Sequence, residues 1–442
     1  MKNIKVLIIL ALIFAFASCE KDFENKNQIT NEQVYSTSYG IVGAAIGMTE
    51  HYATSTYGAI VEVPGITTRE IGITSTFATP YELALGGAVL PNENTGIARL
   101  WRNLLKDKGI AEEILAHIDD VKAEPELKAG VKAYAKFFKA MTLGYLIQNF
   151  EKAPINNAFD GNAVFSSREE VLKECISLLE SAKNDLQQEG AADFINEKVS
   201  VEFDLQNVIN AYLARYSLFA GEYQKAISAA NDVDLNSRSV WTYDATNHKN
   251  PVFQFAVFES PDTKPTDNFG LVGDLKPDPA DGRISFYLSP LDSLGTEETG
   301  SWPIEDLLGF FDAVDKSIPV YLPGEMLLIK AEANAKMGNL QDAVAFINQV
   351  RTKTDDVFGV NAGLSDWTGD AGNLSAILDE IYINRCAEMF FSGMRLEDSR
   401  RIHSNFVPSP QGDLHSERNR NYYPYPYEER LNNANIPNDP AI

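Results

Sequence analysis

Apolar residues recur at three- and four-residue spacing over long stretches of the chain, which is the pattern of helices with one buried face. We expect such helices over about 31–52, 95–118, 126–150 and 375–393. A further helix is predicted to begin at Ser167, because Ser167 and Glu170 form a capping-box pattern just before an apolar run. The chain is therefore expected to be mainly helical.

Two long stretches break this pattern. Residues 54–94 are rich in Thr, Gly and Pro without a sustained period, which indicates a long loop. Residues 235–320 are interrupted repeatedly by proline, and only short apolar runs such as Val252–Phe258 suit a β-strand. The tail over 422–442 is rich in Pro and Asn and is expected to be extended. We expect a helical body with a loop-rich insertion that carries short strands.

One helix-turn-helix pattern occurs twice. Residues 210–231 and 327–348 align at a separation of 117 positions, which brings Gly221 onto Gly338. In each copy the glycine follows a helix and supplies the positive φ that ends it. Small residues at matching positions let the paired helices pack closely, as in tetratricopeptide repeats. We predict a tetratricopeptide-like body with helical repeats over about 95–234 and 321–401, and the insertion over about 235–320.

The N-terminus has the features of a secretory leader. Lys2 and Lys5 precede an apolar run over 6–17, which is too short to span a membrane. The run ends in Ser18-Cys19, which resembles a bacterial lipobox, where the cysteine becomes the lipidated first residue. We expect a signal peptide over 1–18, a lipidated extended linker over 19–30, and a single body over 31–442. Acyl chains on Cys19 would anchor the protein without a spanning segment.

Charge excludes several classes of partner. The 442 residues carry 38 basic and 62 acidic side chains, a formal charge of −24, which becomes −26 when Lys2 and Lys5 leave with the leader. Such an acid excess disfavours nucleic acid, because phosphates would be repelled. It also disfavours docking on anionic lipid. Three cysteines are too few for a disulfide scaffold.

The sequence lacks the motifs of the common enzyme classes, and we expect neither catalysis nor a cofactor. It has no GxSxG elbow, Walker A loop, GxGxxG fingerprint or HExxH pair, and no two of its five histidines have a helical metal-site spacing. Cys175 and Cys386 are expected to be buried thiols. A calcium site at Asp274, Asp278 and Asp281 stays open beside a solvated acidic loop, since the EF-hand spacing is missing.

Several segments together resemble the SusD/RagB family of bacterial nutrient-binding lipoproteins. Beyond the lipobox, the similar segments are Asp281-Gly282-Arg283, Pro319–Arg351, Ile377–Arg401 and Tyr423–Pro440. The acidic residues after Cys19 also resemble the surface-export signal of Bacteroidota lipoproteins. Pro323-Gly324 and Cys386 depart from the family pattern, and the former is expected to bend the start of its helix.

The resemblance implies a function as well as a fold. It implies a lipid-anchored protein of the outer membrane, exposed at the cell surface. It further implies a SusC-like TonB-dependent transporter as partner, to which the protein delivers captured oligosaccharide. Two alternatives stay open: a helical-repeat adaptor that binds peptide or protein, and an all-helical glycoside hydrolase with a carboxylate pair about 5–9.5 Å apart.

Ligand contacts are chosen by chemistry, because sugar rings pack on aromatic side chains while their hydroxyls need polar partners. Trp302 is the first candidate for a ligand contact, and the alternative is that it anchors a loop. Tyr287 is the second candidate. Of Tyr287 and its neighbour Phe286, one is expected to pack internally. The remaining candidates lie in loops: Tyr81, Phe77, Asn92 and Trp367. The net charge favours a neutral oligosaccharide. The charged positions over 385–401 are expected to form salt bridges that hold the last helices on the repeats.

Overall fold

The protein is described by a computed structural model over residues 34–158, 160–199, 202–259, 261–294 and 301–442. The predicted signal peptide, Cys19 and the linker lie outside these residues. Among the described residues no helix is both long enough and apolar enough to span a bilayer.

Helices dominate the first half of the chain. They are α3 (Ser38–His51), the π-helix η1 (Tyr52–Thr56), α4 (Tyr57–Thr67), α5 (Ala78–Leu85), the 3-10 helix η2 (Gly87–Val89), α6 (Thr95–His117), α7 (Pro125–Asn149), α8 (Arg168–Asp185), α9 (Ala191–Lys198), α10 (Leu205–Phe219) and α11 (Tyr223–Asn231).

The second half combines helices with most of the short strands. Its helices are α12 (Pro251–Ala256), η3 (Asp267–Gly270), η4 (Gly273–Leu275), α13 (Gly282–Tyr287), α14 (Pro323–Lys336), α15 (Leu340–Arg351), α16 (Leu374–Glu388), α17 (Arg395–Ile402) and α18 (Tyr427–Asn432). The strands form antiparallel pairs: β1 (Ile71–Ile73) with β5 (Thr263–Pro265), β2 (Lys152–Pro154) with β3 (Phe165–Ser167), β4 (Val240–Trp241) with β8 (Ile318–Pro319), and β6 (Leu288–Leu294) with β7 (Pro303–Leu307).

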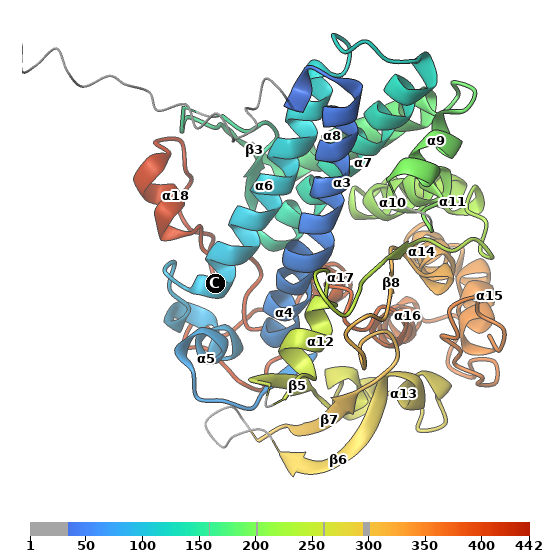
Figure 1. The fold of residues 1–442 in the computed structure, drawn as a ribbon. Coiled ribbons are helices and arrows are strands. Elements are labelled where there is room, and N and C mark those ends of the chain that lie inside the picture. The colour runs from blue at the N-terminus through green and yellow to red at the C-terminus, as the bar shows by residue number, and fades with distance from the viewer. Residues whose placement is uncertain (1–33, 159, 200–201, 260, 295–300) are drawn as a thin grey trace, which may run out of the picture.

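The long helices follow the predicted periodicity. α7 packs against both α6 and α8, and Figure 1 shows α3 and α6 side by side. Ser167 and Glu170 form both hydrogen bonds of the expected capping box at the start of α8. Asn94 begins α6, because its side chain accepts from the backbone N–H groups of Gly96 and Ile97.

The two repeated segments form neighbouring helix pairs. Gly221 separates α10 from α11 at φ 76°, and Gly338 separates α14 from α15 at φ 84°. α11 packs against α14, so segments far apart in sequence build one stack, at the right of Figure 1. The predicted mainly helical, tetratricopeptide-like body with a loop-rich insertion is confirmed.

Three local predictions are wrong. Residues 54–94 are largely helical, because η1 and α4 continue from α3, and nearly every residue of α4 is buried. A helix buried on all sides has no polar face, so its sequence shows no amphipathic period. Residues 252–258 form most of α12 rather than a strand, since Asn250 caps the segment and Pro251 occupies its first helical position. The tail contains the short helix α18.

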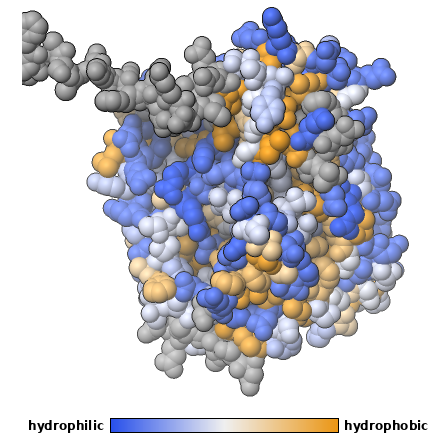
Figure 2. All heavy atoms as spheres, in the orientation of Figure 1, coloured by the Kyte–Doolittle hydropathy of each residue, from blue (hydrophilic) through white to orange (hydrophobic). Residues whose placement is uncertain are grey.

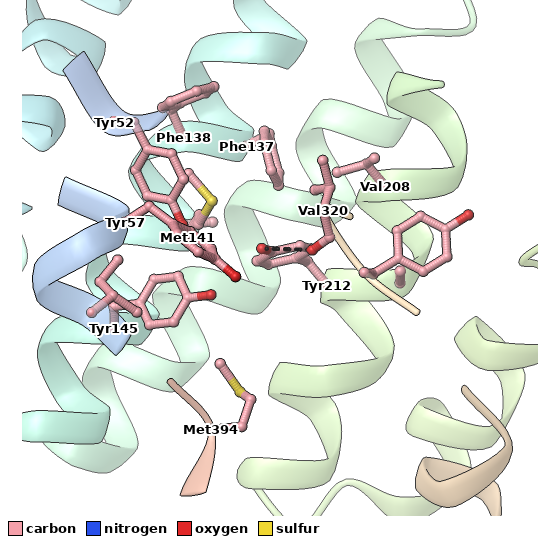
Figure 3. Packing of buried hydrophobic residues seen from close by; sticks show 14 of the residues in the cluster. Tyr52, Tyr57, Phe137, Phe138, Met141, Tyr145, Val208, Tyr212, Val320 and Met394 are labelled. Carbon is pink, nitrogen blue, oxygen red and sulfur yellow. Dashed lines mark hydrogen bonds between the residues drawn. The ribbon is translucent and has the colours of Figure 1, made fainter. Parts of the chain in front are cut away.

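Aromatic side chains fill the interior between the N-terminal helices and the repeats. Figure 3 shows Tyr52, Phe137, Phe138 and Tyr212 meeting there, with the Tyr212 hydroxyl donating to the backbone oxygen of Val320. The rings of Phe137 and Tyr212 meet edge to face, with centroids 5.1 Å apart. Such pairs add to the stabilisation that burial of apolar area provides. Cys175 and Cys386 are confirmed as buried thiols, and Trp101 and Trp241 are buried as well.

The charged positions of the last helices form buried salt bridges, as predicted. Arg385 pairs with Asp398 at 2.8 Å, and Arg401 pairs with Glu332 at 2.6 Å, which ties α17 to α14. Arg283 pairs with Asp281 at 2.7 Å and also reaches Glu388. Asp281 therefore caps α13 and neutralises an arginine. Buried pairs of this kind fix geometry because either charge left alone would be costly.

Candidate functional site

Tyr287 does not reach the surface, which corrects its prediction as a ligand contact. Its side chain is fully buried at the end of α13. The ring packs edge to face against Phe269 and Phe390. Phe286, its alternative, is only partly buried.

Trp302 lies at the edge of the insertion, directly before β7, and is half-buried. Its indole Nε1 donates to the backbone oxygen of Leu414 at 3.1 Å, and its ring packs on His415 with centroids 4.9 Å apart. The guanidinium of Arg69 lies over the ring, 5.4 Å from its centroid. Trp302 therefore anchors a loop, and the residue as a whole is only partly covered from solvent.

Phe77 and Tyr81 belong to the start of α5. Phe77 is 64% exposed, which is unusual for so large an apolar side chain, and Tyr81 is half-buried. The segment over 410–416 joins this helix to Trp302, because the backbone N–H of Asp413 donates to the backbone oxygen of Leu85. Trp302, Phe77 and Tyr81 thus lie on elements held together by one loop, and we name these three the Trp302 surface.

The last two candidates, Asn92 and Trp367, contact other parts of the protein than Trp302 does. Asn92 is half-buried, and its backbone oxygen accepts from the N–H of Tyr427 at the start of α18. Trp367 packs against the cluster formed by α15 and α16, and its backbone N–H donates to Asn348 Oδ1 at 2.8 Å. Trp367 is therefore separate from the Trp302 surface.

Sequence reasoning missed an open pocket of about 660 Å³ between α4, α6 and α12. Its wall includes residues of η1, and π-helical turns often mark functional sites. The polar and charged side chains lining it are His51, Thr54, Ser55, Glu62, Arg99, Arg102, Asn103, Asn247, Lys249 and Gln254. The sequence did not reveal this pocket, because the η1–α4 segment was expected to be a loop and α12 was expected to be a strand.

A hydrogen-bonded network behind the lining fixes His51 in the wall of this pocket. The carboxylate of Asp107 is buried and contacts His51 Nδ1 at 2.6 Å and the Thr56 hydroxyl at 2.6 Å. Burial raises the pKa of Asp107, while the bonds from His51 and Thr56 oppose that rise. Across the pocket wall, Asn103 Nδ2 donates to the backbone oxygen of Ser55 at 3.2 Å, which ties α6 to the π-helical turn.

No group of three or more side chains suited to holding a metal ion occurs in the part of the chain that the structure describes. The five histidines and two cysteines of that part are accounted for by other contacts or by burial. The candidate site residues in that part of the chain are therefore aromatic and polar side chains.

Comparison with family models finds similarity over the C-terminal part of the chain. The model described as the SusD family matches residues 315–440. A comparison with curated proteins finds no match.

Solved structures match the whole fold. A SusD superfamily protein from Bacteroides thetaiotaomicron has 16% identity and a TM-score of 0.69, covering 91% of this chain and all of its own. One from Bacteroides vulgatus has 14% identity and a TM-score of 0.61, over 90% and 98% of the two chains. A SusD-like carbohydrate-binding protein from Bacteroides fragilis has 14% identity and a TM-score of 0.63, over 92% and 100%. The predicted resemblance is confirmed.

Proposed function

We propose that this chain, which resembles the SusD family in sequence over residues 315–440 and in its fold, binds an oligosaccharide at the cell surface without cleaving it. A structure with the same fold is described as a SusD-like carbohydrate-binding protein. Binding rather than catalysis also fits a sequence that lacks the common hydrolytic motifs.

The observation that carries this proposal is the Trp302 surface. Phe77 and Trp302 present aromatic rings outside the helical core, on elements joined by the 410–416 segment. The C–H faces of a sugar ring pack on such rings, and nearby polar groups bind its hydroxyls. An adaptor for peptides would instead be expected to use the helix faces of the repeats.

The proposal includes the anchoring and the partner that the family resemblance implies. A leader over 1–18 would be removed, Cys19 would carry the lipid, and residues 19–30 would link it to a single body over 31–442. In the outer membrane the body would meet a SusC-like TonB-dependent transporter and deliver its ligand to it. A membrane anchor of acyl chains requires no spanning helix.

Isothermal titration with oligosaccharides tests the Trp302 surface. Trp302→Ala and Phe77→Ala should each weaken binding by about three- to tenfold, since one aromatic contact is worth about 0.5–1.5 kcal/mol beyond area burial. Phe77→Ala is the cleaner variant, because Trp302→Ala also removes the hydrogen bond to Leu414.

Tyr39→Ala is the matched control, since Tyr39 is a 90% exposed aromatic at the start of α3. It should leave the affinity unchanged. If both test variants bind as tightly as the unchanged protein, the Trp302 surface is not the glycan site.

A further inference from the structure

We infer that the pocket between α4, α6 and α12 binds the carboxylate or sulfate group of an acidic saccharide. This inference rests on the proposed glycan-binding function and specifies the ligand class at a second place on the surface. The pocket's volume of about 660 Å³ is within the range of small-molecule sites. Figure 2 shows hydrophilic and hydrophobic residues mixed over this face of the molecule, with hydrophilic residues over much of α6, which forms one wall of the pocket.

Charge distinguishes this pocket from the rest of the molecule. Three cationic side chains, Arg99, Arg102 and Lys249, line it, against a single carboxylate, Glu62. The chain as a whole carries −24, so a local excess of positive charge runs against the overall trend. A concave site lined by one sign of charge concentrates ligands of the opposite sign.

Two of the three cations are available to a ligand. Among the described residues Arg102 and Lys249 have no ion-pair partner, and both are exposed at the pocket. Arg99 pairs with Glu62, yet its Nε is buried without a hydrogen-bond partner. Arginine recognises planar carboxylates and sulfate-like oxyanions through paired N–H groups, so these side chains fit an anionic substituent.

The remaining lining suits the rest of a sugar. Asn247 and Gln254 present exposed amides, and Thr54 and Ser55 present hydroxyls from the π-helical turn, all of which can bond sugar hydroxyls. Phe255 is only partly buried and, with Gly58 and Ala59, gives the pocket an apolar side. The combination of anion-binding, hydroxyl-binding and apolar surfaces matches a charged sugar better than a free inorganic anion.

The expectation of a neutral ligand, drawn from net charge, is thereby revised for this pocket. Net charge describes the field far from the protein, and salt screens it beyond about 8–10 Å. A ligand inside the pocket responds to the nearest charges, which are basic. Carboxylated and sulfated sugars share this chemistry, so the test must separate them.

The test is titration of the full body with two sets of acidic probes. Trigalacturonate and a hyaluronan tetrasaccharide carry carboxylates without sulfate, and κ-carrageenan oligosaccharides carry sulfates without carboxylate. Methyl-esterified trigalacturonate and maltotriose serve as uncharged probes. The double variant Arg102→Gln/Lys249→Gln removes the two unpaired cations, and Lys122→Gln is the control, because Lys122 is exposed and lies outside the pocket.

We expect at least one acidic probe to bind at least tenfold more weakly to the double variant than to the unchanged protein or to Lys122→Gln. The same probe should bind more weakly as NaCl rises, and this salt dependence should shrink in the double variant. Whether that probe carries carboxylates or sulfates assigns the anionic group.

Other outcomes overturn the inference in distinguishable ways. If uncharged glycans bind and no acidic probe does, the glycan-binding function stands and the pocket inference fails. It also fails if an acidic probe binds the double variant and the unchanged protein equally well. If no glycan of either kind binds, the proposed function fails, and this inference fails with it.

Discussion

Glu70 shows how the interior imposes a chemical state on one side chain. It is fully buried just after α4, where its Oε1 accepts the backbone N–H of Phe391 at 3.0 Å and its Oε2 has no hydrogen-bond partner. Phe391 has φ 56°, an uncommon value for a residue with a side chain. Glu70 therefore holds a strained turn between α16 and α17. Burial raises its pKa to about 7, although Arg395 and the Phe391 bond oppose the rise.

Glu70→Gln should reduce the pH dependence of stability. Because the folded pKa of about 7 exceeds the ordinary glutamate value of 4.5, the folded state binds more protons between these pH values and its free energy of unfolding falls as pH rises. The loss from this group is on the order of 3 kcal/mol by pH 8. Gln keeps the acceptor for Phe391 and removes the titration.

Urea unfolding at pH 5 and pH 8 measures the effect. The variant should lose less stability than the unchanged protein between these two pH values. Equal losses in both proteins would show that Glu70 is not protonated in the folded state near neutral pH.

At the scale of elements, a buried ion pair connects the two repeated helix pairs. Arg215 of α10 and Glu325 of α14 form two hydrogen bonds, of 2.6 and 2.7 Å, with both side chains almost fully buried. The pair lies beside the aromatic interior, where the Arg215 guanidinium also lies 4.1 Å from the centroid of the Tyr212 ring. It fixes the relative position of α10 and α14.

Glu325→Leu should destabilise the protein by about 3–5 kcal/mol, because it leaves Arg215 charged and buried. Glu180→Ala is the control: Glu180 pairs with Lys225 at 2.9 Å on the surface, and its loss should cost less than about 1 kcal/mol. The double variant Arg215→Met/Glu325→Leu should recover much of the loss. Thermal unfolding of the unchanged protein and the three variants measures these losses of stability. If Glu325→Leu costs as little stability as Glu180→Ala, the Arg215–Glu325 pair does not hold α10 on α14.

The elements that could be predicted are those with local signals. α8 has its capping box, and the repeated pairs have glycines with positive φ between helices. α4 and α12 gave no such pattern: α4 is buried and apolar except at Glu62, and the short apolar run of α12 fits either type of structure. The pocket depends on both, so no reasoning from local sequence could assemble it. Tyr287 was misjudged since the side of a chain that becomes buried is decided by tertiary packing.

At the scale of the molecule, an acidic body carries the proposed binding surface, and a lipid on Cys19 is the proposed anchor. The net charge of −24 keeps the surface away from polyanions in general, while the pocket between α4, α6 and α12 reverses the sign locally. The repeats supply rigidity, and the 410–416 segment joins α5 to Trp302, which lie more than 200 residues apart in sequence. Binding residues on loops held by a rigid scaffold are common in proteins.

Cys19→Ala should release the protein from membranes. The leader would still direct export, but the thiol that accepts the lipid would be gone, and acyl chains are the proposed anchor. Membrane fractionation of cells that express each form measures this, with Cys175→Ala as a control that keeps Cys19. Equal membrane association of Cys19→Ala and the unchanged protein would exclude lipid anchoring at this residue.

The central claim is that the protein captures a glycan and leaves it intact. The most direct measurement is calorimetric titration of the protein with a panel of neutral and acidic oligosaccharides, followed by chromatography of the ligand recovered from each mixture. We expect saturable binding of at least one oligosaccharide, recovered at its original length. Binding of none, or recovery of shortened products, would contradict the account.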